Sequence, residues 1–107
     1  MEQIDLEMVR GDDENWVFDV TNDEQTDIDF TGCRFDLHIK PEKGAIIKLS
    51  TTTGDIAINK NQITVKLPHE KTEKVTWETA SWDLQCIDKN DLVTTLAGGE
   101  FVLPTRF

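Results

Sequence analysis

The feature that most constrains this sequence is the recurrence of apolar residues at every second position. Five runs show it: residues 4–8, 16–20, 33–39, 63–67 and 82–86. Successive side chains of a β-strand point to opposite faces of the pleat, so this period of two indicates strands with one face in a core and the other in water. Five such runs in a chain of 107 residues predict an all-β protein.

Turn-forming residues divide the chain into about eight or nine short strands. We expect strands at residues 2–9, 15–21, 33–40, 45–49, 55–59, 62–67, 79–88, 92–96 and 100–103. Pro41 ends the third of these because proline cannot donate to a ladder, and Lys60-Asn61 forms a hairpin turn. Ala97-Gly98-Gly99 is expected to separate the last two strands.

Residues 68–75 are the one segment with helical character, because a proline opens it and charges of both signs follow. The segment is too short to be stable alone, so we expect a single helical turn that crosses between two sheets. Turns every 8 to 12 residues are typical of a sandwich or small barrel, and the crossover favours two sheets packed face to face.

The length limits the chain to one domain, residues 1–107, with a single core. We expect that core to consist of large residues on the apolar parity of the strands. They are Trp16, Phe18, Phe35, Leu37, Ile63, Val65, Trp82, Leu84 and Phe101.

The charge is strongly acidic, with 21 Asp and Glu against 11 Lys and Arg, a formal net charge of -10. Nucleic-acid binding depends on replacing counterions with basic side chains, and anionic membranes attract the same residues, so we expect neither partner. A basic protein partner, a cation or solubility alone would account for the charge. The start of the chain has no basic and apolar leader, so we expect synthesis in a cytoplasm.

The two cysteines, Cys33 and Cys86, both fall on the apolar parity of their strands. Buried free thiols are the preferred interpretation, because a cytoplasmic protein is kept reduced. A disulfide between the two sheets stays open as an alternative, and a catalytic thiol is a distant third.

No catalytic, cofactor-binding or metal-ligating residue is assigned. His38 and His69 lie in different elements without partners at metal spacing, and Ser50 and Ser81 lack a nucleophile motif. The acidic stretches 12–14 and 23–29 could hold calcium, but they lack the alternating spacing and the glycine of a calcium loop. The tripeptide 10–12, Arg-Gly-Asp, is interpreted as a break between two strands. We therefore expect no enzymatic activity and no cofactor.

Strand edges are the more promising surfaces, because an outer strand carries unpaired backbone groups that can recruit another chain. The threonine-rich segments 51–53 and 94–95 are compatible with addition of a strand from a neighbour. They are equally compatible with ordinary polar faces.

The order of short motifs resembles a known group of proteins. Arg10-Gly11-Asp12 precedes the strand with Trp16 and Phe18, and residues 28–33, Ile-Asp-Phe-Thr-Gly-Cys, lead into the next. After these come Pro-Glu-Lys-Gly at 41–44, the strand and proline at 62–68, Trp-Asp-Leu-Gln-Cys at 82–86 and the final motif at 99–104. This order resembles small immunoglobulin-like β-sandwich proteins of tailed phages and prophages, and the N-terminal domain of baseplate upper proteins.

The resemblance implies an immunoglobulin-like sandwich that serves as a structural component of a virion, tail or baseplate. Its partners would be other phage tail or baseplate proteins, with self-association as a further option, and it would be made in a bacterial cytoplasm. The family supplies no catalytic residue to carry over. The alternative function is a small carbohydrate- or calcium-binding module that uses the end loops and an exposed aromatic residue such as Trp77.

Overall fold

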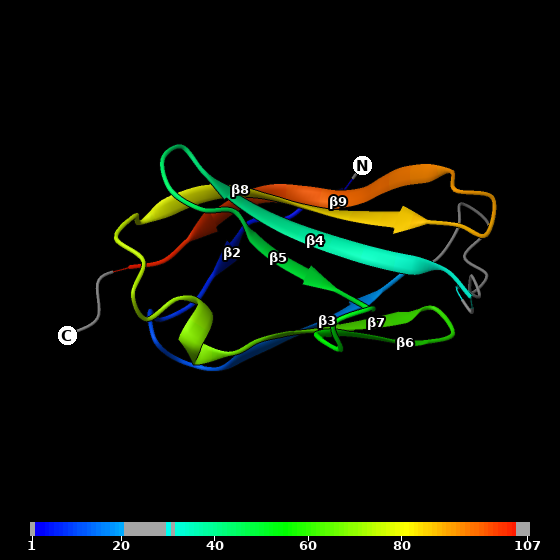
Figure 1. Cartoon of the computed structure of the whole chain (residues 1–107), viewed down its shortest axis with the longest axis horizontal. Helices are drawn as coiled ribbons and strands as arrows, with labels where there is room; N and C mark the ends of the chain where they lie inside the picture. Colours follow the sequence, from blue (N-terminus) through cyan, green and yellow to red (C-terminus); the bar gives the residue numbers. More distant parts are fainter. Residues whose placement is uncertain (1, 21–29, 31, 105–107) are drawn as a thin grey trace.

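The computed structural model describes residues 2–20, 30 and 32–104, and Figure 1 shows their arrangement in two layers. The strands, in chain order, are β1 (Glu2–Gln3), β2 (Leu6–Glu7), β3 (Glu14–Asp19), β4 (Arg34–Pro41), β5 (Ile47–Ser50), β6 (Ile56–Asn59), β7 (Gln62–Leu67), β8 (Thr79–Ile87) and β9 (Val93–Val102). One 3-10 turn, η1 (His69–Lys71), lies between β7 and β8. The expected all-β architecture in two sheets is confirmed.

The two sheets differ in size. The large sheet has the order β1-β9-β8-β4-β5, and β2 also pairs with β9. The small sheet has the order β3-β7-β6. All pairings are antiparallel except those of β1 and β2, which run parallel to β9, so the large sheet is mixed. The N-terminal segment thus continues the large sheet and leaves β3 at the end of the small one.

Local sequence explains the end of β4 and the turn that follows it. β4 stops at Pro41, and Gly44 in the following turn has φ +115, a backbone conformation that glycine adopts without steric cost. Lys60, in the tight turn between β6 and β7, takes φ 56. The predicted crossover is confirmed, because η1 and its flanking residues carry the chain from β7 in the small sheet to β8 in the large sheet.

The C-terminal strand and the first strand both differ from the prediction. β9 is continuous from Val93 to Val102, so the expected break at residues 97–99 is wrong. The irregularity lies at Leu96 instead, which is the unpaired extra residue because Gln85 pairs with Thr95 and Leu84 with Ala97. The single strand expected at residues 2–9 is two short segments, β1 and β2.

The glycines inside β9 admit the N-terminal segment to the sheet. A Cβ atom at Gly99 would overlap the carbonyl oxygen of Ile4, and the Ile4 amide donates to the Gly98 oxygen at 2.8 Å. Asp5 completes the contact by accepting the Glu100 amide at 3.0 Å. Glycine inside a strand here marks the close approach of another backbone rather than a break.

The core lies between the sheets and includes most of the residues expected there. Seven of the nine expected core residues are buried, whereas Trp16 and Phe18 on β3 are only partly buried against the core. Fully buried apolar residues that the prediction did not include are Ile39, Leu49, Leu67 and Leu103. Trp16 and Phe18 still join the layers, with ring centroids 6.0 Å from Phe101 and 5.9 Å from Trp82.

No helix in the described part of the chain is long and apolar enough to cross a membrane. The acidic stretch 23–29 lies outside the described residues, so the structure does not bear on its expected loop conformation or on its calcium hypothesis.

Candidate functional site

The Arg-Gly-Asp tripeptide belongs to a structural junction where three segments meet. The Arg10 guanidinium donates to the carbonyl oxygens of Trp77 at 2.9 Å, of Leu103 at 3.0 Å, and of Val75. The Gly11 amide donates at 3.1 Å to the hydroxyl of Thr72, which is fully buried. The planar guanidinium with its several donors suits such a cluster of carbonyls. Arg10 therefore ties the crossover and the end of β9 to the chain entering β3.

Asp13 and His69 form an exposed ion pair next to this junction. The Asp13 Oδ1 accepts the His69 backbone amide at 2.7 Å and lies 2.9 Å from Nδ1 of the same residue. The backbone hydrogen bond, followed by the imidazole, lowers the pKa of Asp13. The hydrogen bond that the His69 imidazole donates to Asp13, followed by the negative charge of Asp13, raises the pKa of His69, with smaller contributions from Glu73 and Glu70. Asp13 thus anchors the start of the crossover.

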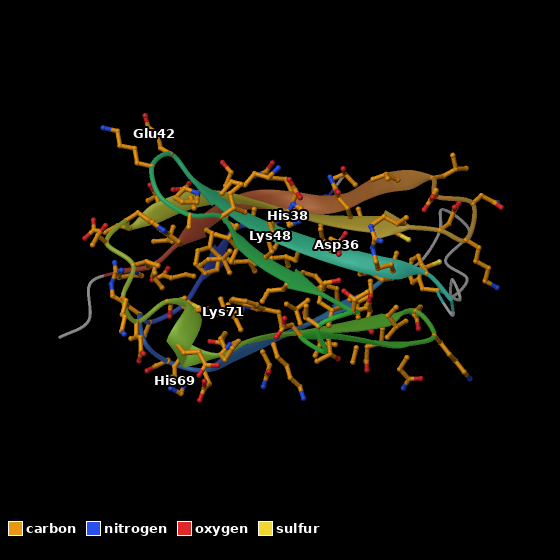
Figure 2. The ribbon with its side chains drawn as sticks, viewed as in Figure 1. Asp36, His38, Glu42, Lys48, His69 and Lys71 are labelled. Carbon is orange, nitrogen blue, oxygen red and sulfur yellow. The ribbon has the colours of Figure 1, made fainter. Side chains whose placement is uncertain are left out.

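His38 lies far from His69, as Figure 2 shows. It is on the outer face of β4, where its Cα partners across the sheet are Lys48 on β5 and Asp83 on β8. The structure therefore keeps the two histidines in separate surroundings. No group of three or more His, Cys, Asp and Glu side chains with metal-binding geometry occurs among the described residues.

The serines are not arranged as nucleophiles within the described part of the chain. Ser81 lines a depression of about 450 Å³ at the ends of β4, β8 and β9, beside Lys40 and Glu100. The Lys40 side chain forms a salt bridge with Asp83, and its Nζ lies 3.0 Å from the carboxylate. Ser50 bonds to Thr52 at 2.9 Å within a turn. This depression offers polar contacts of both signs and no activated nucleophile.

Both cysteines are free. Cys86 is on β8, and Cys33 directly precedes β4, the neighbouring strand. An inter-sheet disulfide is therefore wrong, because the two residues do not lie on different sheets. Cys86 is buried as expected, whereas Cys33 is partly exposed. Burial, followed by the neighbouring Cys33 thiol, raises the pKa of Cys86 to about 11, which leaves little of the reactive thiolate near neutral pH.

Trp77 does not form an exposed platform for a sugar. It is partly buried, and its ring packs edge-on against Phe101 with centroids 6.0 Å apart. The threonine-rich segments also have internal roles. Thr53 in residues 51–53 donates to the Ser50 carbonyl at 3.0 Å, and Thr94 and Thr95 pair with β8 along one side of β9.

The strand edges are the feature that sequence patterns could not locate. In the described part of the chain, β3, β5 and β6 have at least four residues each and pair along one side only, and the two-residue strands β1 and β2 also lie at an edge. β3 is the longest of the three, with six residues, and its Val17 side chain is 54% exposed. A second exposed apolar pair, Leu92 and Val93 at 64% and 58%, lies where the chain turns from β8 into β9.

Comparison of the chain with models of known protein families gave no match, and a search of curated proteins also gave none.

Proposed function

We propose that this protein is a non-enzymatic structural component of a phage or prophage virion, associated with the tail or baseplate. It would act through protein–protein contacts with other tail or baseplate proteins, after synthesis in the bacterial cytoplasm. The order of sequence motifs motivates the assignment. The open strand edges support its mechanism, because they provide contact surfaces that need no ligand or reaction.

The strand order supports an immunoglobulin-like sandwich as the finer description of the fold. In immunoglobulin domains the second, fifth and fourth strands are neighbours in one sheet, and the third, sixth and seventh lie together in the other. If the N-terminal segment counts as the first strand, the order β3-β7-β6 matches the second, fifth and fourth strands. The order β9-β8-β4 then matches the seventh, sixth and third strands, with β5 as an additional strand beside β4. The N-terminal segment departs from the constant-type arrangement because it joins β9 instead of β3. The chain also lacks tyrosine and an inter-sheet disulfide.

The exposed apolar residues are the observation that carries the contact function. Val17 lies on an unpaired strand edge, and Leu92 and Val93 project from a turn, in a protein with a net charge of -10. Stable protein interfaces usually bury more than about 1,000 Å² and place apolar side chains near their centre. The acidic charge favours a basic protein surface as partner and disfavours nucleic acid and anionic membranes.

Mass spectrometry of purified phage particles tests this function. Particles induced from the source bacterium should contain the chain at a constant ratio to a known tail protein through successive gradient steps. Deleting the gene should remove the chain from the particles and alter their tail or baseplate morphology in electron micrographs. Recovery of the protein only in particle-free fractions would contradict the proposal.

Tryptophan fluorescence distinguishes the proposed contact function from the alternative, glycan binding or calcium binding. Titration with a glycan panel and with Ca²⁺ should leave the emission unchanged if protein contacts are the function. A saturable shift with either ligand would favour the alternative, and substitution of Trp77 would then identify whether that residue reports it.

A further inference from the structure

We propose that β3 is a receptor edge for an extended segment of a partner protein in which lysine or arginine alternates with apolar residues. The inference rests on the proposed contact function and specifies the surface and the chemistry of its partner. The added segment would lie beside β3 as a fourth strand of the small sheet, on the side opposite β7.

The backbone of β3 shows which groups are available for such pairing. The Val20 amide donates to the Asn61 carbonyl at 3.1 Å, so the backbone N–H of Val20 points toward the β6–β7 hairpin. The Asn15 amide instead bonds to the side chain of Glu14 at 3.1 Å. Backbone groups alternate in direction along an antiparallel strand, so those of Asn15, Val17 and Asp19 point away from β7. Among the described residues, no other strand pairs with them.

The side chains of β3 leave apolar area for an added strand to cover. Trp16 and Phe18 face the core but remain partly exposed, although the equivalent large residues of the central strands are buried. Val17 projects from the opposite face and is 54% exposed. A strand beside β3 would extend both faces, and its inward apolar residues would lie next to Trp16 and Phe18.

The charge around β3 selects a basic partner. Residues 11–20 contain four acidic residues and no lysine or arginine: Asp12, Asp13, Glu14 and Asp19. Asp13 is already bonded to His69, which leaves the other three for a partner. Natural edge strands are usually protected by charged side chains, above all lysine, by proline or by a bulge, and the only charges on β3 are the acidic Glu14 and Asp19. A second copy of the same chain would bring these carboxylates together, whereas lysine or arginine would pair with them.

The other edges fit this role less well. β5 and β6 have four residues each, and β5 carries the exposed Lys48 at its centre. The outer side of β9 is already occupied by β1 and β2 from Ala97 onward. β3 is therefore the longest of these edges and the one with the most acidic residues.

A peptide titration of the full chain tests the proposal. The probe is a capped nine-residue peptide in which valine alternates with lysine or threonine, and its control has glutamate in place of lysine. Backbone amide exchange followed by NMR should show protection of Val17 and Asp19 by about tenfold or more at saturation with the lysine peptide. The β5 and β6 edge amides should be unchanged, and the glutamate peptide should bind at least about tenfold more weakly.

Two substitutions at one position distinguish backbone hydrogen bonding from nonspecific hydrophobic binding. Val17→Pro removes an amide that does not bond to β7, so it should preserve the small sheet and weaken lysine-peptide binding by about tenfold or more. Val17→Thr keeps that amide and should bind within about threefold of the wild type. If Val17→Pro does not fold, the double variant Asp12→Lys with Asp19→Lys should reverse the preference between the two peptides.

Several results would overturn the proposal. These are absence of peptide binding, protection at another edge, equal affinity for both peptides, or concentration-dependent protection of β3 by a second copy without peptide. Failure of the tail assignment is distinguishable, because it would appear as absence of the chain from particles while the peptide still protects β3. Conversely, normal incorporation of Val17→Pro into particles would retain the tail function and overturn the role of β3.

Discussion

β8 and β3 both direct alternate apolar side chains toward the core, and each carries a tryptophan, but the two strands hold opposite positions in their sheets. β8 has a neighbour on each side, β4 and β9, whereas β3 pairs only with β7. Trp82 of β8 is 2% exposed, and Trp16 of β3 remains partly exposed. Equal hydrophobic patterns therefore bury their side chains to different degrees, because burial also depends on how many strands flank the one that carries them.

The placement of the N-terminal segment produces this difference. β1 and β2 join β9, where Gly99 gives the backbone room to approach, and the Trp82 indole N–H donates to the Ile4 carbonyl at 2.8 Å. Nothing in the described part of the chain plays the same role beside β3. The strand that carries Trp82 thus lies inside the large sheet, and β3 lies at an edge of the small one.

The largest expected effect compares the two tryptophans. Trp82→Ala should lower the free energy of unfolding by about 3–5 kcal/mol, because it leaves a cavity and an unpaired Ile4 carbonyl. Trp16→Ala should cost about 2 kcal/mol, since part of its ring is already in water. Urea denaturation measures both values. Equal losses would contradict the contrast between central and edge strands.

Arg10 tests the junction that joins the two sheets. Arg10→Ala should destabilise the protein by about 2–3 kcal/mol, because it leaves carbonyls of the crossover and of residue 103 without their donor. Arg10→Lys should recover less than half of the loss, since one ammonium cannot reach the three carbonyls with the same geometry. Denaturation curves of both variants give the measurement. Full recovery by lysine would show that charge alone is sufficient.

Gly99 tests the covering of the large sheet. Gly99→Ala should cost about 1–3 kcal/mol and increase amide exchange in β1 and β2, because its Cβ would displace the backbone at Ile4. Gly54→Ala is the matched control, since alanine would be strained at its φ of +85 while no heavy atom lies within 4 Å of the added Cβ. The control should lose some stability without faster exchange in β1 and β2. Similar exchange patterns in both variants would contradict the close-approach explanation.

The smallest effect concerns the Asp13–His69 pair at the entrance to β3. The pKa of His69 is raised in the folded protein, so protonated His69 stabilises the fold. This stabilisation is complete at pH values below the unfolded-state pKa of about 6.5 and is lost as the pH rises through the folded-state pKa. The pKa of Asp13 is lowered in the folded protein, so ionised Asp13 also stabilises the fold. This stabilisation is present at pH values above the unfolded-state pKa of about 3.9 and is lost as the pH falls through the folded-state pKa.

The melting temperature of His69→Gln should therefore lie further below that of the wild type at pH 5.5 than at pH 8.5. Asp13→Asn should lose stability at both pH values, since the carboxylate also accepts the His69 amide. The differences should be small because both side chains are exposed. If the melting temperature of His69→Gln fell further below that of the wild type as the pH rises, the expected direction of the effect would be contradicted.

Sequence patterns located most strands but not their neighbours. The alternation at residues 33–39 and 82–86 identified the inward faces of β4 and β8, and Pro68 marked the crossover. The glycines at 98 and 99 were misassigned because a strand break and the close approach of a distant backbone use the same residue. The Cys33–Cys86 geometry was equally hidden, since parity gives the face of a strand and not the sheet to which it belongs.

The sequence by itself determined the all-β class, the inward face of each strand and the acidic surface, because these follow from side-chain period and charge, which are local properties. Only the tertiary structure decided that β1 and β2 pair with β9 and that β3 remains an open edge. Strand pairing is a contact between residues far apart in the chain, and the free energies of alternative pairings differ through packing that no single strand encodes.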